Sequence, residues 1–152
     1  MTVEVKALCA EVTIGTNVYG PHVTGYAIDS VSESKKLNPF NVNQGRAKVV
    51  IDATHIMKAS DLTAPIIGNI TGPISTASSV MEPVNFYKEL RKDNKTAHEF
   101  MTFVTAQVIK FARAQIAAGA DVIAISDPSG TGEILGPKLF EEFAVTYLNM
   151  LL

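Results

Sequence analysis

Polar residues that could bind a ligand or take part in a reaction follow the short apolar runs of this sequence. They are Gly15-Thr16-Asn17 after one run, Asn69, Thr71 and Gly72 after a second, and Asp127 and Ser129 after a third. If the runs are parallel strands, their carboxyl ends lie at one edge of a sheet, where α/β proteins bind ligands. The chemistry available there is hydrogen bonding by amides and hydroxyls, together with one carboxylate.

That carboxylate, Asp127, is the strongest single candidate. A carboxylate at the end of an apolar strand must be solvated, hydrogen-bonded or used in function. Asp127 is therefore either a functional group or a cap for a nearby helix or loop, and the sequence leaves both interpretations open.

The glycine-rich loop at 130–136 does not encode a nucleotide site. It has three residues between its second and third glycines, where the dinucleotide fingerprint has two, and it lacks Gly-Lys-Ser/Thr. Ser129 lacks the Gly-x-Ser-x-Gly elbow of hydrolases. We interpret this loop as a lead into a helix that begins at Pro137, a favoured first helical residue.

Metal ligands are not encoded at useful spacing. The histidines are His22, His55 and His98. None has a second ligand two to four residues later in the sequence, and all are far from the single cysteine, Cys9. We expect no bound metal, an inert Cys9 that acts as a small hydrophobe, and solvated carboxylates at Glu4 and Glu11 beside it.

Strand and helix patterns alternate along the chain. We expect strands at 10–14, 65–70 and 121–126 and helices at 45–60, 75–81, 86–91, 96–118 and from 137 to the end. The long helix has a capping box, Thr96-Ala97-His98-Glu99, and ends before Gly119. The first helix has an apolar stripe of Val49, Ala53, Ile56 and Met57.

Alternating strands and helices predict the α/β class, with parallel βα units. A doubly wound sheet and a (β/α)8 barrel both fit this pattern. Residues 17–44 form a long irregular connection, and no linker divides the chain, so we expect residues 1–152 to form a single unit.

Composition excludes several classes of partner. The 152 residues carry 13 Lys+Arg against 15 Asp+Glu, a net charge of −2 without a basic run, so nucleic acid and anionic membranes are poor partners. A single cysteine and an N-terminus without a secretory pattern indicate a reducing cytoplasm.

Several motifs together resemble the uroporphyrinogen decarboxylase superfamily, especially its methylcobamide:coenzyme M methyltransferase branch. They are Met1-Thr2-Val3-Glu4, Gly72-Pro73-Ile74-Ser75-Thr76-Ala77-Ser78-Ser79, Ala117-Ala118-Gly119-Ala120-Asp121-Val122-Ile123, Ser126-Asp127-Pro128-Ser129 and Leu135-Gly136-Pro137-Lys138-Leu139-Phe140-Glu141-Glu142-Phe143. The resemblance implies a (β/α)8 TIM barrel. Such barrels need about 250 residues, so we expect an internal fragment forming part of an incomplete barrel.

The resemblance also implies which residues line a substrate pocket: Asn69, Thr71, Gly72, Ser79, Asp127 and Ser129. In the decarboxylase branch the catalytic Asp and Arg would precede Met1, and a Tyr would stand at Ser79. In the methyltransferase branch a His-x-Cys pair and a later Cys hold zinc, all beyond the position that matches Leu152. We therefore expect no catalytic residue, metal or cofactor in this chain, with zinc only in full-length methyltransferase relatives.

Three functions remain open. The first is a fragment of a corrinoid-dependent methyltransferase of one-carbon metabolism, inactive alone, with a corrinoid protein as its partner. The second is a metal-free decarboxylase-like protein acting on a tetrapyrrole, which Glu4 and Ser79 disfavour. The third is a non-catalytic binding module.

The open sheet of a partial barrel predicts self-association. Three parallel strands leave two unpaired edges, and an inward face of Val12, Ile66, Ile70, Val122 and Ile125 loses its opposite wall. Apolar residues are 47% of the chain and charged residues only 18%. We expect a second copy to pair edge to edge or face to face, which light scattering at several concentrations would test.

Overall fold

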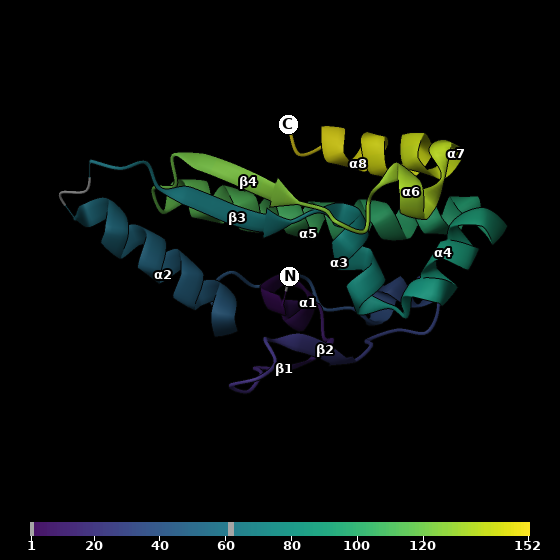
Figure 1. Ribbon diagram of the computed structural model, residues 1–152, viewed down its shortest axis with the longest axis horizontal. Coiled ribbons are helices and arrows are strands. Elements are labelled where there is room, and N and C mark those ends of the chain that lie inside the picture. Colours follow the sequence, from purple (N-terminus) through teal and green to yellow (C-terminus); the bar gives the residue numbers. More distant parts are fainter. Residues whose placement is uncertain (1, 61–62) are drawn as a thin grey trace.

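The computed structural model describes residues 2–60 and 63–152; Met1, which begins the first motif above, lies outside them. Strands β3 (Ile67–Thr71) and β4 (Val122–Ser126) pair in parallel, with Ile67 opposite Val122 and Thr71 opposite Ser126. Helices connect and flank these strands (Figure 1). The α/β class with parallel strands is thus confirmed.

The first expected strand does not join this sheet, which corrects the prediction of three parallel strands. Strand β1 (Glu11–Thr13) pairs antiparallel with β2 (His22–Gly25), inside the region expected to be irregular. The two form a separate small sheet, as Figure 1 shows. Adjacent segments pair as hairpins at little entropic cost, which explains this local choice.

Helix α5 (Asn94–Ala117) covers one face of the β3–β4 sheet. A side-chain carboxylate of Asp93 accepts the Thr96 N–H at 3.2 Å, so the helix begins two residues before the predicted capping box. The prediction of a capping box that begins at Thr96 is therefore wrong, because Asp93 caps the helix instead. Gly119, with a φ of +111°, ends the helix as predicted.

The two faces of the sheet differ, which corrects the expected inward face. Ile70 is buried against the helical side, while Val122 is 52% exposed and Ile67 is 62% exposed on the opposite side. Val122 and Ile70 cannot share a face, because side chains of a strand alternate and Val122 pairs with Ile67. Val12 belongs to the other sheet altogether.

Helix α2 (Gly45–Ala59) forms where predicted, but its stripe faces outward. The exposed fractions are 65% for Val49 and 67% for Ile56, and the helix buries Ala47 and Thr54 instead. The described elements that α2 packs on include α1 (Thr2–Ala7) and α5. The chain described here thus leaves an apolar helix surface uncovered.

Helix α1 was not predicted, and it changes the surroundings of its neighbours. Its Val5, together with the following Leu8, is fully buried. Cys9 ends the helix in a left-handed conformation, with a φ of +78°, and is exposed. The expectation that Cys9 packs as a small hydrophobe is therefore wrong.

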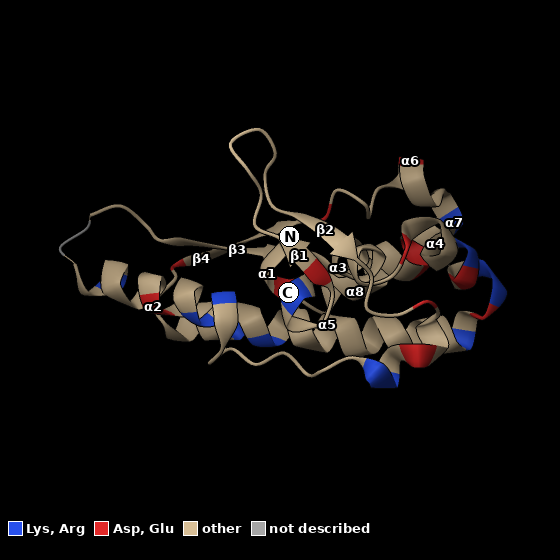
Figure 2. Ribbon diagram, turned by 90° about the horizontal axis from the view of Figure 1, so that it is seen from below, with Lys and Arg blue, Asp and Glu red and all other residues tan. Residues whose placement is uncertain are grey.

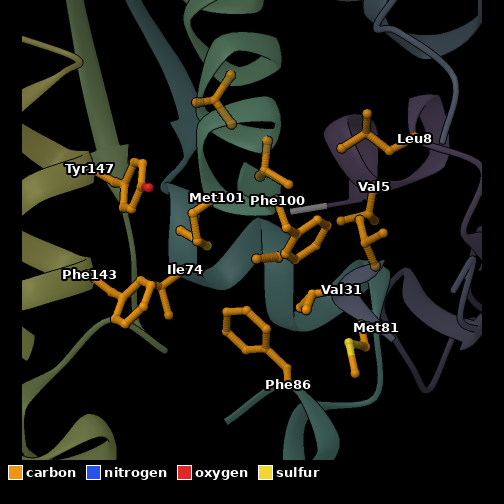
Figure 3. Close-up of a cluster of buried hydrophobic side chains, with 14 of the residues drawn as sticks. Val5, Leu8, Val31, Ile74, Met81, Phe86, Phe100, Met101, Phe143 and Tyr147 are labelled. Atoms are coloured by element: carbon orange, nitrogen blue, oxygen red, sulfur yellow. The ribbon is translucent and has the colours of Figure 1, made fainter. Parts of the chain in front are cut away.

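The core lies where α3 (Pro73–Val80) and α4 (Pro83–Lys92) meet α5 (Figure 3). Ile74, Phe86 and Phe100 are fully buried there, from one helix each. The rings of Phe86 and Phe100 meet edge to face at 6.1 Å between centroids. Helix α3, which carries the predicted pocket residue Ser79, is thus anchored by the core.

The C-terminal segment begins at Pro137 as predicted and continues through α7 (Pro137–Leu139), a π-helical stretch (Phe140–Val145) and α8 (Thr146–Asn149). It follows the short α6 (Gly132–Leu135). Tyr147 Oη donates to the His98 carbonyl at 2.8 Å, and Phe143 stacks on the His98 ring. Burial raises the pKa of the Tyr147 phenol, so it remains a donor at neutral pH.

None of the described helices is long and apolar enough to cross a membrane.

One ion pair makes the fold sensitive to acid. Asp121 accepts the Ile66 N–H at 2.9 Å and lies 2.6 Å from Lys58 Nζ, and these two contacts hold the pKa of Asp121 below its usual range. A lowered pKa stabilises the fold above the unfolded-state pKa, and this stabilisation is lost as pH falls through the folded-state pKa. Asp121→Asn should therefore reduce the loss of stability between about pH 7 and about pH 3.

Urea unfolding at both pH values measures this difference. Asp52→Asn serves as a matched control, because Asp52 pairs with Lys48 within one exposed helix. An equal response of the two variants would contradict a special role for Asp121.

Candidate functional site

The carboxyl ends of β3 and β4 meet side by side, as the sequence predicts. Thr71 lies opposite Ser126, and the Gly72 N–H donates to the Ser126 carbonyl at 2.8 Å. This bond continues the ladder one residue beyond β3, so Gly72 and Asp127 leave the sheet next to each other.

Asp127 caps helix α3 across the sheet. Its two carboxylate oxygens accept the backbone N–H groups of Ser75 at 2.7 Å and Ile74 at 3.2 Å. These donors lie in the first turn of α3, where backbone N–H groups lack partners within the helix. The N-cap residue, Gly72, has no side chain, so Asp127 supplies the cap from the position directly after β4. The structure therefore gives Asp127 a capping role.

Gly72 is required by this arrangement. A Cβ atom at Gly72 would lie 2.4 Å from the Asp127 Cβ and 2.5 Å from its Cγ. Such a separation is far below van der Waals contact, so the space beside Gly72 holds the Asp127 side chain and no other.

Gly72→Ala should therefore lower the free energy of unfolding by about 1.5 kcal/mol through overpacking. In an Asp127→Gly background the clash is absent, so the same alanine should cost much less. Urea denaturation of the four proteins in this double-mutant cycle measures the coupling. Equal costs of Gly72→Ala in both backgrounds would contradict the assigned contact.

Ser75 links Ser129 and Ser79 by hydrogen bonds, a role that the sequence did not predict. Its Oγ accepts the Ser129 N–H at 2.9 Å, and its carbonyl accepts the Ser79 hydroxyl at 2.7 Å. Ser75 itself is fully buried. Its position three residues after the N-cap glycine was a usable signal, because first-turn serines favour contacts near helix starts.

Glu4 also belongs to the site, contrary to the expectation that it is solvated. It is 3% exposed, and its Oε1 accepts the Thr71 N–H at 2.7 Å from helix α1. Thr71 is itself buried. The sequence feature that could have indicated this role is the place of Glu4 in the Met-Thr-Val-Glu motif, because the local residue pattern did not predict helix α1.

The structure thus brings together five of the six predicted residues. Thr71, Gly72, Ser79, Asp127 and Ser129 lie within one network around the start of α3. Asn69 stands apart on the exposed face of β3, two residues before Thr71, and its carbonyl accepts a hydrogen bond from Gln115 Nε2 at 3.1 Å.

Three cavities lined by described residues lie away from the strand ends. One of about 460 Å³ is lined by α1, residues 38–41 and the start of α2, and others of about 330 and 620 Å³ lie near Asp121 and near Pro137. None of these three contains any of the six predicted residues.

The donor set does not fit zinc. Within residues 2–60 and 63–152, no three His, Cys, Asp or Glu side chains gather closely enough to hold a metal ion. His22 Nδ1 lies 3.0 Å from the Gly20 carbonyl, and His98 packs under the C-terminal segment.

We predict less than stoichiometric zinc in the purified protein. Elemental analysis after dialysis against a chelator measures it. One zinc per chain that survives the chelator would contradict the prediction, since tight sites need three or four protein ligands.

These features describe a parallel α/β protein whose polar residues gather at the strand ends. The family model for uroporphyrinogen decarboxylase (URO-D) matches residues 1–152, so the chain belongs to this family. A methyltransferase from Methanosarcina mazei has a similar structure, with a TM-score of 0.87 and 29% identity, over 99% of this chain and 45% of that one.

Curated relatives include two kinds of enzyme. The methylcobamide:CoM methyltransferase MtaA of Methanosarcina barkeri is 28% identical over 150 residues, which are 98% of this chain and 44% of the relative. MtbA of Methanosarcina acetivorans is 25% identical over 97% of this chain and 43% of its own length. A uroporphyrinogen decarboxylase of Tolumonas auensis is 29% identical over 73% of this chain and 33% of its own length. The chain spans less than half the length of these relatives.

Proposed function

We propose that this chain is part of an incomplete (β/α)8 barrel of the corrinoid-dependent methyltransferase type, in which it supplies a pocket wall. The single observation that carries the proposal is the likeness to methyltransferases over nearly the whole chain, at under half of their length. The part of the relatives that this chain does not cover would supply the strands that close the barrel around the β3–β4 ends. In this proposal residues 1–152 form a single structural unit. The protein works in a reducing cytoplasm.

The hydrogen bonds of the site support a positioning role. Both of its carboxylates accept backbone N–H groups: Asp127 those of Ile74 and Ser75, and Glu4 that of Thr71. A carboxylate that accepts backbone N–H groups is fixed in position and orients the groups it binds. These residues therefore fix the rim of the pocket, where Ser79 and Ser129 contribute shape and hydrogen bonding.

The reaction we propose for the complete barrel transfers a methyl group from a methylated corrinoid protein to a thiol. In the family that the sequence resembles, zinc lowers the pKa of that thiol. The residues of this chain do not provide such a site, so its part is limited to binding and orientation. A corrinoid protein is the proposed partner of the whole barrel.

A decarboxylase function is the second candidate, because uroporphyrinogen decarboxylases also match. The decarboxylase branch would place a tyrosine at Ser79. Here the Ser79 hydroxyl is short and donates to the Ser75 carbonyl at 2.7 Å, so it cannot reach a substrate as a phenol would. We therefore favour the methyltransferase type.

An assay of methyl transfer from methylcobalamin to a thiol, with zinc present, tests the proposal. We expect no methylated thiol above the protein-free control from this chain alone, whereas MtaA of Methanosarcina barkeri serves as the positive control. Methyl transfer by the chain alone would contradict the wall role and would also exclude a non-catalytic binding module.

A further inference from the structure

The cavity of about 460 Å³ lies among helices rather than at the strand ends. It is bounded by α1, by residues 38–41 and by the start of α2. Helices α1 and α2 pack on each other and on α5, and no residue of β3 or β4 lines the cavity. Strands that complete a barrel join the sheet at its two edges, whereas this cavity belongs to the layer of helices.

Two cations line this cavity from different helices. Lys6 comes from α1 and Arg46 from α2, and no Asp or Glu is among the lining residues. Among the residues that the structure describes, neither side chain forms an ion pair, whereas Lys48, two positions after Arg46, pairs with Asp52. Figure 2 shows Lys and Arg segments, in blue, where the start of α2 approaches α1. Two like charges at one cavity repel each other, and an anion bound between them offsets this repulsion.

The other polar side chains of the cavity are amides that can donate hydrogen bonds. They belong to Asn38, Asn41 and Gln44. The Asn41 Oδ1 accepts the Asn43 N–H at 3.0 Å, which leaves the Asn41 Nδ2 as a donor, and Gln44 makes no capping hydrogen bond to α2. Guanidinium, ammonium and amide donors suit a phosphate group, whose three terminal oxygens accept more donors than the two oxygens of a carboxylate.

The cavity can also hold an apolar group. Val3, Pro39 and Val49 line it together with the polar residues. Val49 is 65% exposed, although it belongs to the apolar stripe of α2. An apolar group packed against Val49 would remove part of this surface from water, which is favourable. A volume of about 460 Å³ suits a small organic molecule.

We propose that this cavity binds a small organic phosphate ester, with its phosphate group between Lys6 and Arg46 and its apolar part against Val49. The two cations supply charge-assisted hydrogen bonds, and the amides complete the shell around the phosphate oxygens. The inference does not depend on the proposed methyl transfer, because none of these residues belongs to the site at the strand ends.

Isothermal titration calorimetry of the full chain with phenyl phosphate tests the proposal, with inorganic phosphate, benzoate and phenol as reference ligands. We expect one phenyl phosphate per chain, weaker binding of inorganic phosphate and benzoate, and no binding of phenol. Lys6→Gln and Arg46→Gln should each weaken the binding of phenyl phosphate about tenfold, since each removes a charge-assisted contact. Lys48→Gln is the matched control, because Lys48 pairs with Asp52 and does not line the cavity.

Circular dichroism should show the same fold for all three variants, because Lys6, Arg46 and Lys48 are exposed. If a variant does not fold, the comparison of ligands on the unchanged chain still decides the matter. The proposal would be overturned by a chain that binds no phenyl phosphate, or by phenol or benzoate binding as tightly as phenyl phosphate. Equal affinities of the two cavity variants and Lys48→Gln would overturn it as well.

Discussion

Asp127→Ala is expected to lower the free energy of unfolding by about 2.5 kcal/mol, one of the two largest effects in this protein. The change removes both acceptors from the first turn of α3 and leaves the N–H groups of Ile74 and Ser75 without partners. The N-cap residue, Gly72, has no side chain that could replace Asp127. Ile74 is fully buried, so water reaches its N–H poorly.

Urea denaturation measures the loss, and hydrogen exchange at Ile74 and Ser75 should speed up in parallel. Asp127→Asn retains one acceptor oxygen and should cost about half as much. Asp29→Ala is the control, since Asp29 is exposed on a loop, and should change stability by less than about 0.5 kcal/mol. A similar effect of Asp127→Ala and Asp29→Ala would refute the capping role.

Glu4→Ala is expected to lower the free energy of unfolding by about 3 kcal/mol. Glu4 is 3% exposed, and its removal leaves the Thr71 N–H buried without its acceptor as well as a cavity between α1 and β3. A buried polar group without a partner carries its full desolvation cost.

Glu4→Gln keeps the amide oxygen as an acceptor for the Thr71 N–H and should retain more than half of the stability lost in Glu4→Ala. Glu11→Ala is the matched control, because Glu11 is an exposed glutamate of the neighbouring strand. Thermal or urea unfolding of the three variants decides the matter. Equal losses for Glu4→Ala and Glu11→Ala would mean that the buried contact contributes nothing.

Long periodic elements were predictable from the sequence because their signals are local. Helix α2, most of helix α5 and strand β4 lie where periodicity and the Gly119 cap placed them. Hydrophobic periodicity does not predict which element packs against each helix face. The stripe at Val49 and Ile56 has the spacing of a buried surface, yet both side chains are exposed in this chain.

Pairing of the first strand was not predictable in the same way. Its partner, His22–Gly25, is four residues long and follows Gly20-Pro21, which indicates a turn rather than a strand. A three-residue strand such as β1 has no periodic signal that distinguishes parallel from antiparallel pairing. The choice depends on the nearness of a partner along the chain.

The candidate site was predicted in its location but not in its connections. The strand ends carry the expected residues, because ligand sites of parallel sheets follow from topology. The contact from Asp127 to Ser75, by contrast, joins residues 52 positions apart, and that from Glu4 to Thr71 spans 67 positions. No local pattern encodes such contacts, so Ser75 and Glu4 became visible only in the folded chain.

If this chain is part of a methyltransferase-type barrel, as we propose, it should function within a chimeric barrel. Residues 1–152 would replace the matching stretch of MtaA from Methanosarcina barkeri, which is 28% identical over 150 residues. Circular dichroism would establish that the chimera folds, and transfer of the methyl group of methylcobalamin to a thiol would be measured. We expect the folded chimera to transfer methyl groups and the chain alone to transfer none. A chimera that folds with native-like cooperativity but transfers none would contradict this proposal.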